Sequence, residues 1–231
     1  MNTTHDQAAQ YQPERRRMVE RLRSHGIRDA RLLDAMYAIP RHCFEPEFIA
    51  QSSYEECAWP INREHTLVEP YYIARACELA HVAAGDHALV IGAGAGYCAA
   101  VLARLCEQVT LVELVDGAAG RTRQVLRSLR IDNVQVVERR GDGGGVPSGP
   151  YDAIVLSASV TKVPQALVDE LAPAGRLVAP VGQSFLQSFV VLRKLDAITE
   201  TSFFDHCIFT PLPSSFGLSR TMTASSARAA C

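Results

Sequence analysis

Three glycines at alternate positions, directly after a short apolar stretch, constrain this sequence more than any other feature. Residues 87–91 are typical of a buried strand, and Gly92, Gly94 and Gly96 follow it. Because glycine has no Cβ, the backbone there can adopt positive φ and a ligand can approach the main chain closely. A helix predicted over residues 97–106 points its first amides at the same place. The pattern therefore predicts a nucleotide-binding turn between a strand and a helix.

The spacing of these glycines discriminates between two nucleotide cofactors. The dinucleotide fingerprint G-x-G-x-x-G needs its last glycine at position 97, where this chain has Tyr97. The spacing G-x-G-x-G therefore favours S-adenosylmethionine (SAM) over NAD. A glycine turn by itself is weak evidence, because a purely structural turn has the same composition.

An acidic residue follows each of the next two predicted strands. Glu113 closes the apolar stretch 109–112, about twenty residues after the first glycine, where a carboxylate can accept hydrogen bonds from both ribose hydroxyls. Asp142 follows the stretch 134–138 and could accept a hydrogen bond from the adenine amino group. Either acid alone is also compatible with an ordinary polar strand end. In combination with the glycine turn, the two acids favour a site for an adenosyl group.

Helix-like and strand-like stretches alternate from residue 70 onward. The predicted helices cover residues 70–82, 97–106, 117–129 and 163–171, and the predicted strands cover residues 87–91, 108–112, 134–138, 151–156 and 175–180. Such alternation predicts right-handed crossovers and a parallel sheet with helices on both faces. Two further stretches, 189–195 and 203–209, predict antiparallel strands at one edge of that sheet. The predicted fold class is therefore α/β, with a Rossmann-like, doubly wound and mostly parallel sheet.

The part of the chain before residue 70 has a different character. Apolar residues at helical spacing end at Gly26, and Asp29 can cap a second helix that stops before Pro40. Residues 41–69 show no regular periodicity. We expect one compact domain, made of a flexible tail at 1–13, a helical segment at 14–69, the SAM-binding part at 70–213 and a second tail at 214–231.

Composition and charge argue against several classes of protein. The formal net charge of −2 provides no field that would attract nucleic acid, and no apolar stretch approaches the roughly 18 residues of a membrane span. The polar N-terminus does not resemble a signal peptide, so we expect a cytoplasmic protein. The seven cysteines include no C-x-x-C pair, which suggests neither a zinc site nor a disulfide framework. We therefore expect a small-molecule or peptide partner rather than nucleic acid or a membrane.

Several stretches occur in a collinear series between residues 18 and 213. They include Ile39-Pro40-Arg41, Tyr54-Glu55, Thr66 to Pro70, Ile91 to Tyr97, Gly141-Asp142-Gly143, Val163-Pro164-Gln165-Ala166-Leu167 and Pro180-Val181-Gly182. In this order they resemble the protein-L-isoaspartate (D-aspartate) O-methyltransferase family. The resemblance implies a SAM-dependent methyltransferase fold with an N-terminal helical lid. It also implies transfer of the sulfonium methyl group to the free α-carboxylate of an isoaspartyl residue.

A reaction of that kind asks little of the protein in acid–base chemistry. A carboxylate with a reference pKa of about 4 is already ionised near neutral pH. Catalysis then depends on placing the acceptor oxygen in line with the methyl group, in a site from which water is excluded.

The sequence departs from the pattern of that family at two positions. The family's T-I-S-x-P motif, whose serine lies against donor and acceptor, corresponds here to Thr66-Leu67-Val68-Glu69-Pro70, so that Val68 replaces the serine. A polar ligand group left without that hydroxyl costs about 1–3 kcal/mol. Val90 stands where family members carry an acid that helps to hold the methionine end of SAM. Both departures fall at the reacting end of the predicted site, whereas the residues predicted for ribose and adenine are retained.

These considerations give two sets of candidate residues. The candidate catalytic residues are Thr66, His65 and Val68. The candidate cofactor-binding residues are Gly92, Ala93, Gly94, Gly96, Tyr97, Glu113, Leu114, Asp142, Gly143 and Ser157. Ser157 belongs to a loop that follows a predicted strand and is expected to face the reacting end of the ligand.

The predicted function is SAM-dependent methyl transfer to a carboxylate, in an isoaspartyl peptide or a similar acceptor. An alternative is a biosynthetic enzyme that acts on a small molecule. It includes intramolecular cyclisation of SAM itself to azetidine-2-carboxylate with release of methylthioadenosine, because apolar residues at 68 and 90 are compatible with that reaction. A SAM-binding protein without turnover is a third possibility.

Overall fold

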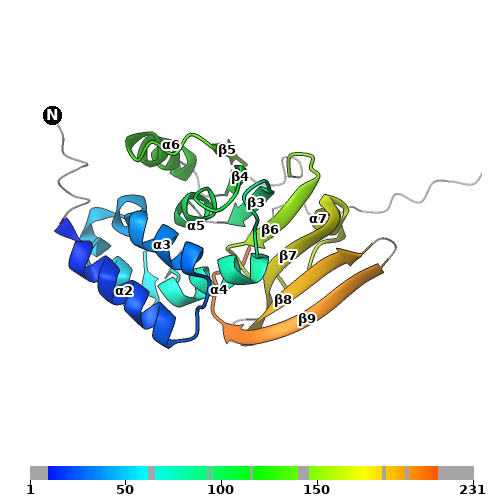
Figure 1. The fold of residues 1–231 in the computed structure, drawn as a ribbon, viewed down its shortest axis with the longest axis horizontal. Helices are drawn as coiled ribbons and strands as arrows, with labels where there is room; N and C mark the ends of the chain where they lie inside the picture. Colours follow the sequence, from blue (N-terminus) through cyan, green and yellow to red (C-terminus); the bar gives the residue numbers. More distant parts are fainter. Residues whose placement is uncertain are drawn as a thin grey trace, which may run out of the picture.

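The computed structural model describes residues 10–61, 66–92, 94, 96–114, 117–139, 146–183, 186–195 and 198–212. Within these ranges the central feature is a seven-stranded sheet with the strand order β5-β4-β3-β6-β7-β8-β9 (Figure 1). Its strands are β3 (His87–Gly92), β4 (Gln108–Glu113), β5 (Val134–Glu138), β6 (Tyr151–Leu156), β7 (Leu171–Gln183), β8 (Leu186–Leu195) and β9 (Ile198–Cys207). The predicted tail at 214–231 lies outside the described residues.

The five strands from β5 to β7 are parallel, and the two strands at one edge are antiparallel. β3 pairs in parallel with β4 and with β6, while β8 pairs antiparallel with both β7 and β9. The chain therefore builds outward from β3 in one direction and then returns to the other side of β3 with β6. This confirms the predicted Rossmann-like, mostly parallel sheet with antiparallel edge strands.

Helices cover both faces of the sheet. They are α2 (Gln12–Ser24), α3 (Ala30–Ala38), α4 (Pro70–Ala80), α5 (Gly96–Leu102), α6 (Ala118–Ser128) and α7 (Gln165–Asp169). Side chains of α2 to α6 form one apolar core with one face of the sheet, and those of α7 form a second core with the other face. Figure 1 shows α2 and α3 beside α4 and α5, so the N-terminal helices extend the first layer.

The central strand β3 supplies side chains to both cores. Ala88 and Val90 belong to the core of the N-terminal helices, whereas Leu89 and Ile91 belong to the core of α7. A strand of a parallel sheet that is covered on both faces is expected to be a continuous apolar run. That is why residues 88–91 lack polar side chains, and why their pattern predicted a buried strand.

The N-terminal segment forms two helices close to the positions that the sequence predicts. In α2, Met18 and Leu22 are almost fully buried. The Asp29 side chain caps α3 by accepting hydrogen bonds from the backbone amides of Arg31 and Leu32, which confirms the predicted cap. The helix α2 begins at Gln12, slightly inside the stretch predicted as an N-terminal tail.

The stretch 41–69 contains short elements that the sequence did not reveal. Three 3-10 helices, η1 (Arg41–Phe44), η2 (Glu47–Ile49) and η3 (Ser52–Tyr54), precede a small antiparallel pair, β1 (Trp59–Pro60) and β2 (Thr66–Leu67). Elements of three or four residues produce no detectable periodicity. Their conformation follows from burial of side chains such as Phe44 and Tyr54 against the helices.

The helix after the glycine turn is shorter than predicted. The stretch 97–106 was expected to be helical, but α5 ends at Leu102. The Asn133 side-chain amide donates hydrogen bonds to the carbonyl oxygens of Ala103 and Cys106, at 2.8 and 3.3 Å. Asn133 lies at the end of the next crossover, immediately before β5, and satisfies carbonyls directly after this helix end, so local sequence carries no signal of the contact.

The last three strands are longer than predicted, because they pair with one another along their whole length. β7 pairs antiparallel with β8 from Arg176 to Gln183, and β8 continues this ladder to β9. The preceding helix α7 is correspondingly short, because the strand ladder begins at Leu171. Among the described residues, no helix combines the length and the apolarity that crossing a bilayer would require.

Gly92 is closely surrounded by other atoms and Gly120 is not, so substitutions at these two glycines test how closely the protein is packed at the glycine turn. A Cβ at Gly92 would lie 2.9 Å from the Cβ of Ser157 and 3.0 Å from its backbone oxygen, whereas a Cβ at Gly120 in α6 meets no atom within 4 Å. We predict that Gly92→Ala lowers the free energy of unfolding by about 1–3 kcal/mol through overpacking. Gly120→Ala should raise it by about 0.5–1 kcal/mol, because alanine favours a helix interior.

Equilibrium unfolding in urea measures both variants. A Gly92→Ala protein as stable as the parent would show that β6 can move away from the turn, contrary to this prediction.

Candidate active site

The carboxyl ends of the parallel strands meet at one edge of the sheet. Gly92 is in register with Glu113, and Glu113 with Glu138, so β3, β4 and β5 end side by side. Ser157, directly after β6, donates its backbone amide to the carbonyl oxygen of Ile91 at 2.8 Å. The glycine turn, Glu113 and Ser157 are thus brought together, as the sequence predicted.

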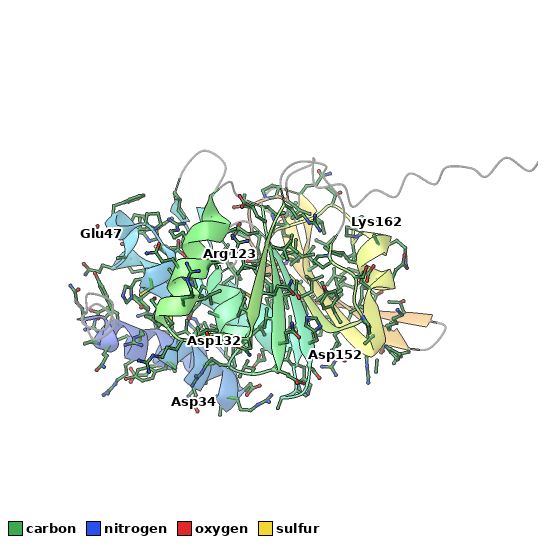
Figure 2. All side chains as sticks on the ribbon, turned by 90° about the horizontal axis from the view of Figure 1, so that it is seen from above. Asp34, Glu47, Arg123, Asp132, Asp152 and Lys162 are labelled. Atoms are coloured by element: carbon green, nitrogen blue, oxygen red, sulfur yellow. The ribbon has the colours of Figure 1, made fainter. Side chains whose placement is uncertain are left out.

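Figure 2 shows which end of the sheet this is. Asp132 and Asp152 lie near the beginnings of β5 and β6 and mark one end of the sheet, and Lys162, which follows β6, marks the other. Glu47 of η2 lies toward the same end as Lys162 in this view (Figure 2). The N-terminal segment reaches the carboxyl edge, because Phe44 of η1 lies against Gly96 and Tyr97 directly after the turn, where ligands bind in open α/β sheets.

Glu113 organises the glycine turn through its carboxylate. Its Oε1 accepts hydrogen bonds from the backbone amides of Gly94 and Leu114, both at 3.0 Å. Gly94 has a φ of +70°, a left-handed conformation that favours glycine. Because the Glu113 side chain is fully buried, these charge-assisted bonds hold the turn against the end of β4.

Gly92 and Gly96 are needed for contacts between parts of the protein. A Cβ at Gly96 would lie 2.9 Å from Thr122 of α6 and 3.0 Å from Phe44 of η1, and the close neighbour of Gly92 is Ser157. The sequence pattern predicted a close approach of ligand at these glycines. The structure shows that neighbouring elements already use that space, and that positive φ within the turn falls on Gly94.

The side chain of Tyr97 lies beneath the N-terminal segment. It is almost fully buried, its ring is 6.1 Å from the ring of Phe44 in an edge arrangement, and the guanidinium carbon of Arg41 lies 5.2 Å from its centroid. Burial raises the pKa of the Tyr97 hydroxyl, so this group stays neutral. The role of Tyr97 in binding a cofactor stays a prediction.

Residues 66–69, which we call the acceptor segment, connect β2 to α4. Thr66 lies in β2, and Val68 is half-buried against the core of the N-terminal helices. The carbonyl oxygen of Val68 accepts a hydrogen bond from Nη2 of Arg41. Glu69 is the N-cap residue of α4 and is half-buried, and burial raises the pKa of its carboxyl group.

Val90 is completely buried at the centre of the sheet. It lies in register with Leu111 of β4 and Val155 of β6, and its side chain belongs to the core of the N-terminal helices. An isopropyl group suits these surroundings. An ionised acid at this position would need a compensating partner.

Four of the predicted site residues lie outside the described residues. These are His65, Ala93, Asp142 and Gly143. Leu114 is half-buried and packs against the core of α7, while its amide donates to Glu113.

Arg41 is a residue of this region that the sequence did not single out as a candidate. It is 2% exposed and contacts both the acceptor segment and Tyr97. Its stretch had no periodicity from which burial could be predicted. A charged residue next to a proline in an irregular stretch would ordinarily be expected at the surface.

Comparisons with known proteins agree with this geometry. The family model described as protein-L-isoaspartate(D-aspartate) O-methyltransferase matches residues 13–216. A Methanoregula boonei protein named protein-L-isoaspartate O-methyltransferase is 39% identical over 205 residues, which cover 88% of this chain and 94% of that protein. A Burkholderia ambifaria protein of the same name is 44% identical over 206 residues, which cover 87% of this chain and 66% of that longer protein.

Solved structures are similar over most of the chain. A structure named protein-L-isoaspartate O-methyltransferase superposes with a TM-score of 0.74 at 25% identity, covering 88% of this chain and 67% of that one. A Plasmodium falciparum beta-aspartate methyltransferase, solved in complex with S-adenosyl-L-homocysteine, has a TM-score of 0.67 at 22% identity, with coverage of 84% and 96%. At 22% identity, the similarity to the Plasmodium falciparum structure shows a shared fold and nothing further.

Replacement of Glu113 tests whether its carboxylate supports ligand binding at the turn. Glu113→Gln keeps the size of the side chain but removes the charge that accepts the amides of Gly94 and Leu114. We predict that it weakens SAM binding about tenfold or more, since a hydrogen bond to a charged group contributes about 1.5–3 kcal/mol.

Glu78→Gln is the matched control, because Glu78 lies near the end of α4, before the beginning of β3, and its Oε1 also accepts two backbone amides, from Arg28 at 2.6 Å and from Asp29 at 3.1 Å. It should change binding by no more than about twofold, as is usual for substitutions outside a site. Isothermal titration calorimetry measures both. Equal dissociation constants for parent and Glu113→Gln would contradict the assignment.

Proposed function

The chain belongs to the protein-L-isoaspartate(D-aspartate) O-methyltransferase family, and we propose on that basis that it transfers a methyl group from SAM to the free carboxylate of an isoaspartyl residue. The observation that carries the proposal is the match of the family model over residues 13–216. It is supported by the contact between the glycine turn and Glu113, and by Arg41, which contacts both Val68 of the acceptor segment and Tyr97 directly after the turn. The comparisons favour carboxyl methylation over the cyclisation alternative.

The residues at the carboxyl edge fit a bound SAM. Gly94 adopts positive φ, and the buried carboxylate of Glu113 holds the turn in place at the carboxyl edge, where ligands bind in open α/β sheets. We propose that Gly92, Ala93, Gly94, Gly96, Tyr97, Glu113, Leu114, Asp142, Gly143 and Ser157 hold the cofactor. When bound, SAM supplies an electrophilic methyl group on its sulfonium.

The contribution of the chain to the reaction is then placement of the acceptor. An isoaspartyl carboxylate is already ionised near neutral pH and needs no general base. We propose that Thr66, His65 and the backbone around Val68 receive it and keep water away. Holding two reactants in line can supply about 7–11 kcal/mol of the barrier. Proton transfer is not needed, because the acceptor is already an anion and the sulfonium leaves as a neutral thioether.

A cytoplasmic location is part of the proposal. The described cysteines are free thiols, and the buried sulfur atoms of Cys77 and Cys98 lie 3.7 Å apart without a disulfide. Unpaired cysteines are typical of proteins in a reducing compartment.

Identification of the nucleoside product tests the proposed reaction. Incubation with SAM and an isoaspartyl peptide should yield S-adenosylhomocysteine and a methyl ester, whereas the same peptide with ordinary aspartate should yield neither. Mass spectrometry of nucleoside and peptide measures both products. Methylthioadenosine formed from SAM alone would contradict the proposal.

The apolar residue in the acceptor segment gives a second prediction. Val68→Ser introduces a hydroxyl that can donate to the acceptor carboxylate. We predict that it raises kcat/KM for isoaspartyl peptide about tenfold, the equivalent of about 1.4 kcal/mol, which is close to the contribution of one hydrogen bond to a charged group. Val68→Ala is the size control, because it removes the same methyl groups without adding a donor. Steady-state kinetics compare the three proteins. An equal rise in both variants would show that space, and not the hydroxyl, limits the reaction.

A further inference from the structure

Arg41 links two parts of the candidate active site. It lies in η1, where its Nη2 donates a hydrogen bond to the carbonyl oxygen of Val68 in the acceptor segment. Its guanidinium carbon lies 5.2 Å from the centroid of the Tyr97 ring, in the first turn of α5. One side chain therefore contacts both the segment proposed for the acceptor and the helix that follows the glycine turn.

The burial of this guanidinium is energetically unfavourable. Arg41 is 2% exposed, and the ion pairs among the described residues do not include it. Its Nε and Nη1 are buried without a hydrogen-bond partner in the described part of the chain. Glu45 compensates the charge only through a longer-range electrostatic interaction. Apolar residues of similar volume commonly stabilise such a position, so packing does not explain an arginine here.

The geometry of a guanidinium group explains why an arginine occupies this buried position. Its planar fork can donate hydrogen bonds at its edge while its face stacks on an aromatic ring, and a lysine ammonium cannot do both. At Arg41, Nη2 donates to the carbonyl oxygen of Val68 and the guanidinium carbon lies over the Tyr97 ring. The side chain thereby links the two elements at a defined separation.

We propose that Arg41 is a positioning residue for methyl transfer. It acts through the backbone of Val68, which it holds in a fixed position relative to the first turn of α5, and its charge favours an anionic acceptor in the space between. The inference rests on the proposed function for the identity of the acceptor. The contact that it assigns to Arg41 can be tested without that function.

Arg15 provides a matched control for burial, stacking and backbone contact. It is 7% exposed, its Nη1 donates to the carbonyl oxygen of Tyr37 at 3.0 Å, and its guanidinium carbon lies 5.6 Å from the Tyr37 ring centroid. These contacts join α2 to α3. Arg15→Lys therefore reproduces the structural cost of Arg41→Lys at a different place in the fold.

The sequence contains one tryptophan, Trp59, which reports on the acceptor segment without any substrate. It is half-buried in β1 and pairs with Leu67 of β2, the residue directly before Val68. Loosening of the Val68 backbone should therefore change the quenching of Trp59 fluorescence by acrylamide.

The experiment compares the full-length parent, Arg41→Lys and Arg15→Lys in four measurements. These are the thermal midpoint, the quenching constant of Trp59, the dissociation constant of SAM and kcat with an isoaspartyl peptide. For Arg41→Lys we expect a higher quenching constant and a kcat reduced at least about tenfold, since misplacement by about 1 Å can cost 10²-fold. SAM binding should change no more than about twofold, and Arg15→Lys should leave quenching and kcat within about twofold of the parent.

Two results would overturn the inference. One is an unchanged quenching constant and kcat in Arg41→Lys, and the other is a parallel change in both variants, which would indicate a general effect of lost stability. If Arg41→Lys does not fold, Arg41→Gln, which removes the buried charge together with its desolvation cost, takes its place with the same expected results. A parent protein that does not methylate isoaspartyl peptide would contradict the proposed function, and the Trp59 comparison would still decide the role of Arg41.

Discussion

β3 pairs in parallel with β4 on one side and with β6 on the other, and the rest of the structure depends on this arrangement. Because all three strands run the same way, their carboxyl ends meet at one edge. The glycine turn, Glu113 and Ser157 follow these ends and become neighbours although they are far apart in sequence. A site at this edge is therefore a consequence of strand direction, before any side chain is considered.

The glycine turn is held by the same arrangement. The register between β3 and β4 places Glu113 opposite Gly92, close enough for its carboxylate to bind the amides of Gly94 and Leu114. The carboxylate of Glu113 fixes the glycine turn, and it also forms part of the surroundings of any ligand bound at that turn. This explains how a fully buried glutamate can be compatible with the fold.

The N-terminal segment depends on a different kind of interaction. The elements η1 to η3 have little regular hydrogen bonding of their own and are held by buried side chains, among them Phe44 against Tyr97 and His42 bonded to the Tyr54 hydroxyl at 2.6 Å. Arg41 adds a buried charge at the point where this segment meets α5. The desolvation of this charge lowers the stability of the protein, and such a loss is tolerated where the orientation of a side chain matters more than stability, as it does next to a reacting group.

The parts of the fold that could be predicted are those specified by periodicity and local chemistry. The apolar stretch 87–91 predicted a strand, the alternation from residue 70 predicted a parallel sheet with helices on both faces, and Asp29 predicted the start of a helix. The predicted ends of α5 and of β7 to β9 were less accurate, because Asn133 and the antiparallel ladder set them from other parts of the chain.

The sequence by itself determined the α/β class, through the alternation of helix-like and strand-like stretches. It also determined the place of the turn and the acid that ends β4, since these depend on residues within a few positions of one another. Only the tertiary structure decided that Gly92 and Gly96 are packed against Ser157 and Thr122, and that Arg41 is buried between Val68 and Tyr97. These contacts join residues 26 to 65 positions apart, and their energies depend on burial and direction. Neither quantity exists until the chain has folded.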